Sequence, residues 1–540
     1  MSRRARFAAA LIAACSLITG AWAQSSSGTI TGRVLDPSSQ TIPGATVTLT
    51  KTDTRDVRTF TTTVTGDFVF TGLQPGPYSL KIQASGFKIV EKTDLDLSAS
   101  QRLPAGDIAL QVGSIAETVN VTAEVATVQT ASSERGALID SNQVNKLTTR
   151  GRDVFGLLAT LPGVVYDGRG ADGLGVQNSP AAFSGARGVY SVSNVDGISG
   201  NTRSGASLDT PVNMDSVSEV KVLLNNYQAE YGKGAAGVIN VITKGGTQSF
   251  HGLGYYYMRN EALNANNFFN NAAGAPRGPY RYKTIGGNIG GPVFIPNHFN
   301  RSRNKLFFFF AQEYLPRTVA QDPRYYTVPT AAERKGDFNL SVGATNGSLY
   351  SAAKIVDPLN KNAAGVMQPF PNGIIPANRI DANMQKLLNV FPLPNAPNVI
   401  NGGALNPSGT WYNYSLQDSL DRPGKQNSLR MDYNISDKWR AFFRGTNEST
   451  DNRGANSTVN RYAWMPDADV NYRLTGPNLG GTLTWVASPT LVNEVIFGYG
   501  LWTENQVYRD AWLAEVQRDK LGINLPQIYP DQNPLKLIPL

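Results

Sequence analysis

The chain has 540 residues, and its 49 basic and 41 acidic side chains leave a formal net charge of +8, which is small for this length. Such an excess, without a basic cluster interleaved with aromatic residues, gives no indication of a nucleic-acid partner. One cysteine, Cys15, and two histidines, His251 and His298, are too few for a metal site built on thiols or imidazoles, so we expect no metal and no cofactor.

The first 23 residues have the three parts of a secretory signal peptide. Arginines among residues 3–6 precede an apolar run at 7–20, and Ala21–Ala23 is a small-residue cleavage pattern. The run is shorter than the roughly 20 residues that a transmembrane helix needs. Lipoprotein-type cleavage at Cys15 is the alternative, but Ala21–Ala23 is better placed. We therefore expect export and removal of the cysteine with the signal.

Residues 28–113 contain short alternating runs separated by turn signals. In the best-marked stretch, Phe68 and Phe70 fall on one face, and a turn at 75–77 leads into a second run that starts at Tyr78. About seven such runs within this length predict a small seven-stranded β-sandwich.

A linker at residues 114–130 contains one more alternating run, "ETVNVTAE". Val119 and Val121 fall on one face and Asn120 on the other, which is a strand pattern. A lone strand is not stable in water, so this run needs a sheet to pair with. It is either the last strand of the sandwich, an ordinary connector, or a strand that adds to the sheet of another protein.

Residues 131–246 have a different sequence pattern, with both helix-like and strand-like runs, which predicts a mixed α/β domain. A short helix is expected at 157–165, stopped by Pro162 and Gly163, and a strand-like run, "VINVITK", lies at 238–244. The glycines at 232–237 spell G-x-G-x-x-G, but a dinucleotide fingerprint must open a helix rather than a strand. We therefore expect a tight turn there and no dinucleotide.

From 247 to 540 the alternating segments become longer and richer in aromatic residues and glycine. We expect strands at 250–260, 280–290, 305–315, 426–434, 439–447, 477–487 and 491–502. In the fourth strand, Leu429 and Met431 fall on the face opposite to Arg430. Apolar-out and polar-in strands, with tight turns alternating with long loops, are typical of a transmembrane barrel. A large secreted sandwich, the alternative, does not need such unequal loops.

These segments together resemble the TonB-dependent outer-membrane receptors of the Oar-like group, with a carboxypeptidase regulatory-like domain at the N-terminus. The motifs that carry this resemblance are "PGATV" (43–47), G-x-F-x-F-x-x-L-x-P-G-x-Y (66–78), "LPGV" (161–164), "ARG" (186–188), "VDGI" (195–198), "EYGKGAAGVINVITK" (230–244), "NKLFFFFAQEY" (304–314) and "IPANRID" (375–381).

The resemblance implies an all-β architecture in five parts. These are a signal peptide (1–23), the sandwich (28–113), a linker with the TonB box (114–130), a mixed α/β plug (131–246), and about seven strands of a transmembrane antiparallel barrel with long extracellular loops (247–540). It implies a Gram-negative outer membrane with the N-terminal domains in the periplasm. The implied partners are TonB, outer-membrane lipid and an extracellular ligand of unknown class.

The resemblance also implies two sets of functional residues. The TonB box would be Glu117, Thr118, Val119, Asn120, Val121, Thr122 and Ala123; the plug residues singled out are Arg187, Gly188, Asp196, Gly197, Glu219, Tyr231 and Gly232. Among these, Arg187 is expected to meet an acid of the barrel, because a charge surrounded by protein needs a partner. A solvated loop arginine is the alternative.

The expected function is uptake of a ligand with energy delivered through TonB, and no enzymatic activity is expected. A non-transporting surface, adhesion or envelope-structure protein is the alternative. Seven strands cannot surround a plug of this size, because the width of a barrel grows with its strand number. We therefore expect that the chain is a C-terminally truncated fragment of a 22-stranded receptor.

Overall fold

The computed structural model describes residues 26–113, 118–122, 133–147, 149–166, 181–200, 212–228, 231–232, 234–266, 268–272, 276–320, 324–339, 355–395, 404–405, 411–416, 419–453, 470–488, 491–508, 510–527, 529–533 and 536. The predicted signal peptide lies outside these residues, as do Glu117 and Ala123. Strands dominate and the helices are few and short, in agreement with the predicted all-β class. Among the described residues, no helix is long and apolar enough to span a bilayer.

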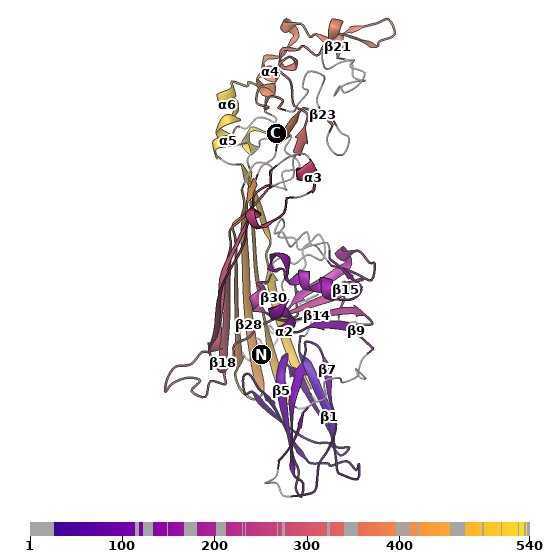
Figure 1. Cartoon of the computed structure of the whole chain (residues 1–540), viewed down its shortest axis with the longest axis vertical. Helices are drawn as coiled ribbons and strands as arrows, with labels where there is room; N and C mark the ends of the chain where they lie inside the picture. Colours follow the sequence, from indigo (N-terminus) through magenta and orange to yellow (C-terminus); the bar gives the residue numbers. More distant parts are fainter. Residues whose placement is uncertain are drawn as a thin grey trace, which may run out of the picture.

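The chain forms three bodies and an upper loop region (Figure 1). A tall sheet stands upright, a two-sheet unit lies at its lower end, and a third unit lies beside its middle. We call residues 26–113 with 118–122 the N-terminal unit, residues 133–247 the middle unit, and the tall sheet the wall.

Two packed sheets make the N-terminal unit. The first has the order β4-β1-β7, and the second has the order β3-β2-β5-β6-β8. Their bounds are β1 Gly28–Leu35, β2 Thr46–Lys51, β3 Val57–Thr61, β4 Asp67–Leu73, β5 Gly76–Gln83, β6 Ile89–Leu97, β7 Arg102–Ala109 and β8 Thr118–Thr122. Phe68, Phe70 and Tyr78 are all buried in the core between the sheets, as their alternation predicts.

A five-stranded sheet with the order β13-β12-β15-β14-β9 forms the middle unit. Its elements are β9 Arg135–Ile139, α2 Ser141–Lys146, η1 Arg150–Arg152, η2 Val154–Thr160, β10 Val164–Val165, β11 Ala182–Phe183, η4 Gly188–Tyr190, β12 Ser191–Val195, β13 Ile198–Ser199, η5 Met214–Ser216, β14 Val217–Asn225 and β15 Gly237–Thr243. The expected helix at 157–165 is instead a 3₁₀ helix that ends before the Pro162-Gly163 turn. Every residue of β15 is buried, because this strand lies between two neighbours at the centre of the sheet.

Seven long strands, each antiparallel to the next, make up most of the wall, a sheet that three short strands extend to ten. The long strands are β16 His251–Arg259, β17 Tyr280–Pro292, β18 Leu306–Leu315, β27 Gly424–Asn434, β28 Trp439–Asn452, β29 Val470–Ser488 and β30 Leu491–Gly500. The described strands form an open sheet, with β16 and β30 at its edges, and no closed barrel is seen. β28 and β29 are longer than expected, because the polar run Glu448–Asn452 pairs with Tyr472–Gly476, in which Tyr472 and Leu474 are buried.

The two faces of the wall differ in chemistry. The exposed side chains of the outer face are apolar or aromatic: Tyr256, Met258, Ile285, Ile289, Phe310, Phe443, Leu479, Leu483, Val495, Phe497 and Tyr499. Trp439 and Trp485, on the same face, stack in parallel with ring centroids 5.5 Å apart beside the tight turn that joins β27 to β28. The buried face toward the other units carries Phe307, Phe309 and Phe442 and many polar side chains: Glu313, Ser428, Arg430, Asp432, Arg440, Arg444, Thr446, Glu448, Asn478, Thr482 and Thr484.

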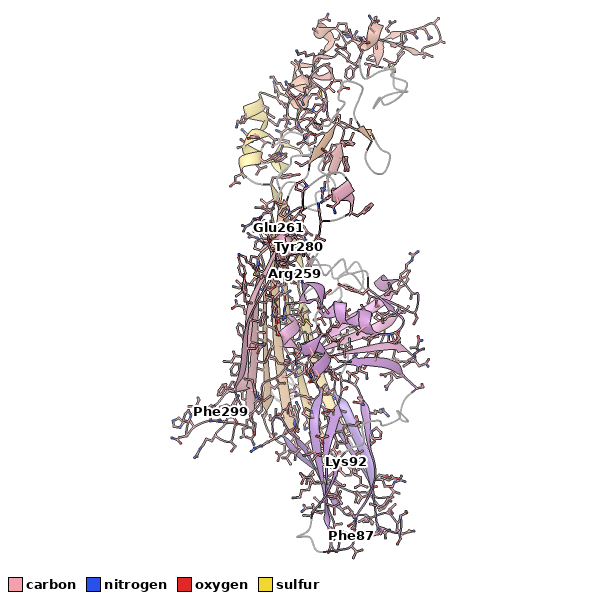
Figure 2. All side chains as sticks on the ribbon, viewed as in Figure 1. Phe87, Lys92, Arg259, Glu261, Tyr280 and Phe299 are labelled. Carbon is pink, nitrogen blue, oxygen red and sulfur yellow. The ribbon has the colours of Figure 1, made fainter. Side chains whose placement is uncertain are left out.

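The two ends of the wall also differ (Figure 2). At the upper end, the hydroxyl of Tyr280 accepts a hydrogen bond from Arg259 (3.2 Å), and Glu261 accepts one from the Tyr280 N–H (3.2 Å). Phe299 marks a short turn at the lower end, on the side where Lys92 and Phe87 of the N-terminal unit lie.

The long connections gather above the wall (Figure 1). Their elements are η6 Glu261–Leu263, α3 Phe268–Ala272, β19 Arg317–Ala320, β20 Arg324–Tyr326, η7 Glu333–Lys335, β21 Val356–Lys361, β22 Met367–Pro369, η8 Pro371–Gly373, η9 Ala377–Arg379, α4 Ala382–Leu388, β23 Ala404–Leu405, β24 Trp411–Tyr412, β25 Tyr414–Leu416, β26 Ser419–Asp421, β31 Thr503–Tyr508, α5 Asp510–Glu515, α6 Arg518–Leu521 and η11 Pro530–Gln532. A small apolar core around Trp512, Val516 and Ile523 packs against Leu387 and Phe391, so distant loops form one body.

Candidate functional site: the contact between the middle unit and the wall

A two-residue turn presents the central acid of this contact. Asp196 and Gly197 join β12 to β13, and both have positive φ, at 49° and 80°. The favoured two-residue hairpin turns need positive φ at these positions, which is why the sequence Asp-Gly forms such a turn. The turn projects Asp196 from the sheet toward the wall, where its residue is only 2% exposed.

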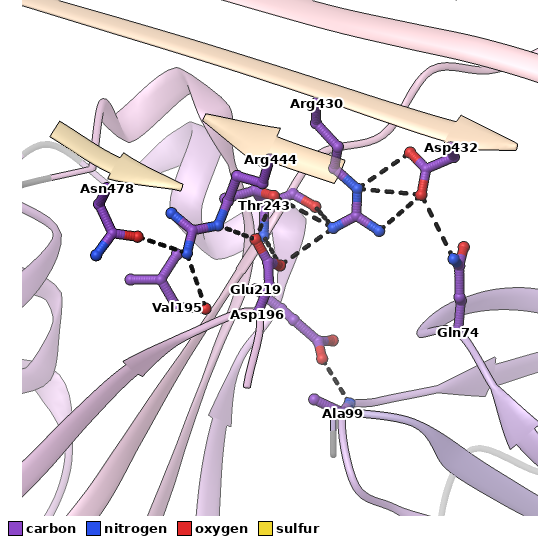
Figure 3. A network of polar contacts seen from close by, with 10 residues as sticks. All are labelled: Gln74, Ala99, Val195, Asp196, Glu219, Thr243, Arg430, Asp432, Arg444 and Asn478. Atoms are coloured by element: carbon purple, nitrogen blue, oxygen red, sulfur yellow. Dashed lines mark hydrogen bonds and ion pairs between the residues drawn. The ribbon is translucent and has the colours of Figure 1, made fainter. Parts of the chain in front are cut away.

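The Asp196 carboxylate is held from its own unit and from the wall at once (Figure 3). The backbone N–H of Thr243 donates to one oxygen (2.9 Å) and the Thr243 hydroxyl to the other (2.7 Å). Arg430 Nη1 lies 3.1 Å from the first oxygen, and Arg444 Nε lies 3.1 Å from the second. One carboxylate of the middle unit therefore bridges two neighbouring wall strands, β27 and β28.

Further partners neutralise and orient the two arginines. Arg430 also pairs with Asp432 on its own strand (2.9 Å) and lies 4.6 Å from the ring centre of Phe442. Arg444 donates to the amide oxygen of Asn478 (2.9 Å). Two arginines thus balance two aspartates in a site almost closed to water, and the added hydrogen bonds offset part of the desolvation of these charges.

Ile198, the residue after the Asp196-Gly197 turn, packs on two glycines of neighbouring wall strands. Gly480 and Gly498 are directly paired across β29 and β30, and Ile198 packs against both. A Cβ added at Gly498 would lie 2.5 Å from Ile198 Cγ2, and one added at Gly480 would clash with the same side chain. The absence of side chains at these positions allows the close approach of the hairpin.

An arginine of the middle unit makes a second contact. Arg152 forms an ion pair with Asp215 of its own unit, and its Nε lies 3.5 Å from Glu313 on β18. Its guanidinium also lies 4.6 Å and 4.7 Å from the ring centres of Tyr255 and Tyr257 on β16. Arginine over aromatic faces adds a cation–π attraction to the charge pairing.

Comparison with known proteins identifies two segments. Residues 242–536, more than half of the chain, match the outer membrane beta barrel domain, and residues 29–111 match the carboxypeptidase regulatory-like domain. The chain belongs to the outer membrane beta barrel domain family. The TonB-dependent transporter Oar of Myxococcus xanthus is 25% identical over 251 residues, which cover 45% of this chain and 23% of that protein. The chain therefore spans less than a quarter of this relative.

Solved structures of lower similarity include the outer membrane transporter YddB from Escherichia coli, with 11% identity and a TM-score of 0.41 over 69% of this chain and 39% of that chain. The siderophore receptor PirA from Acinetobacter baumannii has 13% identity and a TM-score of 0.32 over 69% of this chain and 44% of that one. The matches agree with the predicted resemblance to Oar-like receptors of the outer membrane, because they combine an outer membrane beta barrel domain with a carboxypeptidase regulatory-like domain and include a TonB-dependent transporter.

Five of the seven predicted plug residues lie in three places in the structure. Asp196 and Gly197 lie at the wall contact. Glu219 lies on β14 and faces the N-terminal unit, where it accepts a hydrogen bond from the Ala99 N–H (2.7 Å). Tyr231 is buried in a small core beside Leu223 and Val238, and Gly232 follows it in the same turn.

Arg187 and Gly188 are the exception, because they lie at the start of η4 and the side chain of Arg187 is exposed. Among the described residues no ion pair joins Arg187 to the wall, and its exposure agrees with the solvated alternative. Arg152 is the middle-unit arginine that meets a wall acid. At the central contact the signs are reversed, since the wall supplies Arg430 and Arg444 and the middle unit supplies the acid.

The run predicted as a TonB box forms β8, which pairs in parallel with β6 of the N-terminal unit. Thr118 lies opposite Ile89 and Thr122 opposite Thr93, and Val119 packs against the core of that unit. The structure thus places this run at the edge of a sheet of its own chain, as in the last-strand alternative. The edge of β6 supplies the backbone partners that a lone strand lacks.

Sequence reasoning did not single out Arg430, Arg444 or Asp432, although the register carries a signal. Because the turn after β27 is short, Arg430 and Arg444 lie directly opposite each other on the inner face. Like charges in directly opposed positions are destabilising, so this pairing requires an acid from elsewhere. That acid is Asp196.

Burial of Asp153 predicts a pH dependence of the middle unit. Its carboxyl caps η2 by accepting a hydrogen bond from the Phe155 N–H (3.0 Å) and another from the Tyr166 hydroxyl. Burial raises the pKa of Asp153, so the folded state holds a proton more tightly than the unfolded chain. Stability from this group is present at low pH and is lost as pH rises through the raised pKa.

Asp153→Asn keeps an acceptor for the cap without a charge. We expect this variant to gain protection of Gly237–Thr243 from hydrogen exchange, relative to the unmodified chain, at about pH 8 but not at about pH 4. Protection factors corrected for intrinsic exchange would measure this. If the ratio of the protection factors of Asp153→Asn and the unmodified chain were the same at both pH values, the raised pKa of Asp153 would be contradicted.

Proposed function

We propose that this chain acts in TonB-dependent uptake of an extracellular ligand, with the middle unit as a plug that moves against the wall. The observation that carries the proposal is the buried, charge-balanced cluster of Asp196, Arg430, Arg444 and Asp432 between the two bodies. The alternative of a non-transporting surface protein requires no such separable contact.

The physical argument is that polar and apolar contacts are distributed differently. Apolar cores lie within the N-terminal unit and within the middle unit, each around its own sheet. The contact between the middle unit and the wall includes the buried ion pairs of Asp196 and Arg152, for which the attraction is offset by the cost of removing charges from water. The charged side chains of this contact regain hydration when the middle unit and the wall separate. The middle unit can therefore leave the wall with less loss of free energy than an apolar interface would impose.

The outer face of the wall supports placement in lipid. Its side chains are apolar, and the stacked Trp439 and Trp485 lie beside the lower turn, as expected of aromatic residues at a membrane boundary. The ends at which β27 meets β28 and β29 meets β30 through short connections would then face the periplasm, and the long connections the exterior.

The position of β8 supports a role in binding TonB. β8 is the end strand of its sheet, and no described strand pairs with its outer edge. Such an edge can accept a strand from another protein, whose backbone hydrogen bonds then carry the affinity. The next strand of the chain, β9, is the edge strand of the middle unit. Tension applied at β8 would therefore reach that sheet at its edge, from which strands can be removed one at a time.

Val121→Pro tests this role, because proline removes a backbone donor and does not fit within a paired strand. We expect the variant to lose binding of a TonB C-terminal fragment to the full chain in detergent by about tenfold or more. Val121→Thr, which keeps the donor and the strand preference, is the matched control. Equal binding by all three chains would refute strand addition at β8 and favour the non-transporting alternative.

A further inference from the structure

Two turns of the N-terminal unit reach the inner face of the wall. The turn between β2 and β3 carries Asp56, and both oxygens of its carboxylate accept hydrogen bonds from Arg440 on β28, from Nε and Nη2 at 2.8 Å each. The Arg440 side chain is 6% exposed, so this bidentate pair lies largely out of water. Charge-assisted bidentate pairs are among the stronger polar contacts in proteins.

Other polar contacts spread this docking over three wall strands. Gln74, on the turn between β4 and β5, donates to Asp432 on β27 (3.4 Å; Figure 3). The hydroxyl of Ser27 donates to Glu494 on β30 (2.6 Å). The backbone carbonyl of Asp53 accepts a hydrogen bond from the Gln248 N–H (3.2 Å), where the middle unit passes into the wall.

The N-terminal unit also holds the middle unit. Ala99 donates its N–H to Glu219 (2.7 Å), and its carbonyl accepts a hydrogen bond from Lys221 (3.1 Å). Both partners lie on β14, so two charged side chains of the middle unit bind the backbone of one residue of the N-terminal unit. The N-terminal unit therefore bridges the two bodies that the Asp196 cluster joins.

A cavity of about 120 Å³ marks the place where the three bodies meet. Asp53, Thr54 and Gln74 line it from the N-terminal unit, Thr243 from the middle unit, and Arg430 from the wall. Arg430 and Thr243 are also the partners of Asp196. The docked turns thus cover the lower side of the ion-pair cluster and keep bulk water away from it.

We propose that the N-terminal unit is a latch that covers the lower end of the seam between the middle unit and the wall and has to undock before the two can separate. The order of events rests on the function proposed above. Because β8 belongs to the N-terminal unit, a partner that pulls on β8 acts on the latch before it acts on β9. Undocking then admits water to the Asp196 cluster and weakens its ion pairs, since charges attract less strongly at a higher local dielectric.

Thiol accessibility tests the latch in the full chain. Thr54 is 7% exposed although it lies at the tip of a turn, and its hydroxyl has no hydrogen-bond partner among the described residues, so Thr54→Cys is a conservative reporter of docking. Ser38, on an exposed turn elsewhere in the same unit, gives Ser38→Cys as a reporter that docking should not affect. Cys15→Ser in both backgrounds removes the natural thiol.

The labelling rate of Thr54→Cys by a maleimide is then compared with and without charge reversal at the Asp56–Arg440 pair. The assay is done in detergent, without ligand or TonB. Asp56→Arg or Arg440→Asp should raise the labelling rate of Thr54→Cys by about tenfold or more, because each leaves an unpaired charge at the contact. The combined swap, Asp56→Arg with Arg440→Asp, should restore protection. The milder Asp56→Asn should give an intermediate rate and serves if a reversal fails to fold.

Three results would overturn the latch: labelling of Thr54→Cys in the unaltered contact as fast as that of Ser38→Cys, no response to charge reversal, or no rescue by the swap. An equal rise for both reporters would show general unfolding and would also refute a specific pair. Because the assay contains no TonB, its failure leaves the uptake proposal standing, whereas failure of the Val121→Pro test leaves the latch untouched.

Discussion

Asp196→Ala is expected to destabilise the contact between the middle unit and the wall by about 3–5 kcal/mol, the range for removing one partner of a buried ion pair. Arg430 and Arg444 would then oppose each other across β27 and β28 without the acid between them. Thr243 would also lose the acceptor for its N–H and hydroxyl. The effect therefore combines repulsion between like charges with two broken hydrogen bonds.

Hydrogen exchange in the full chain would measure this loss, because local opening of the β12–β13 hairpin exposes its amides. We expect faster exchange at Ser191–Val195, with the N-terminal unit unchanged. Asp67→Ala is the matched control, since Asp67 forms an ion pair with Arg33 at 2.7 Å on the exposed surface and should have little influence. Unchanged exchange in Asp196→Ala would show that the cluster does not hold the hairpin.

Replacing all the charged residues of the Asp196 cluster should have a different effect from removing Asp196 alone. Arg430→Met and Arg444→Met, added to Asp196→Ala, remove the stranded charges rather than leaving them buried. Apolar replacement of a complete buried ion cluster is often neutral or stabilising. Asp432 would still lack its partner and needs Asp432→Asn in the same chain. We expect slower exchange at the hairpin than in Asp196→Ala alone, and uptake that is impaired because the contact no longer separates readily.

The periodicity of the sequence was sufficient to predict most of the long strands, for a physical reason. In a wall with one apolar and one polar face, side chains alternate, so Leu429 and Met431 could be assigned to the face opposite to Arg430 without a structure. The upper part of β28, Glu448–Asn452, is polar at every position and therefore carries no such alternation. In the upper part of β29 the order is reversed, because Tyr472 and Leu474 lie on the buried face, so this run does not show the apolar-out pattern that predicts a lipid-facing strand.

Long-range partners were not predictable in the same way. The pattern of β8 shows that it is a strand, but the choice between β6 and a foreign sheet depends on what lies beside it in space. The exposed Arg187 and the buried Arg430 are both arginines in the sequence, and only the fold distinguishes them. The hairpin register was the one local clue, because it places Arg430 opposite Arg444 and so requires an acid.

Phe155→Ala is expected to unfold the middle unit locally while the rest of the chain stays folded. Phe155 lies on η2, is 2% exposed, and belongs to the same core as Leu158, Val220 and Val241. Truncation of a buried phenylalanine costs about 3–5 kcal/mol. That loss is a large part of the stability of a small domain, which rarely exceeds about 15 kcal/mol.

The loss of stability in Phe155→Ala should be confined to the middle unit. Because the core around Phe155 is separate from the core of the N-terminal unit, exchange should accelerate in β12 and β15 but not in β2 and β5. Leu80→Ala, in the fully buried core of the N-terminal unit, should give the reverse pattern. If either variant destabilised both units and the wall together, the three would form one cooperative body. A plug that moves inside the wall while the wall stays intact would then be physically excluded, and a separable contact at Asp196 would have no role in uptake.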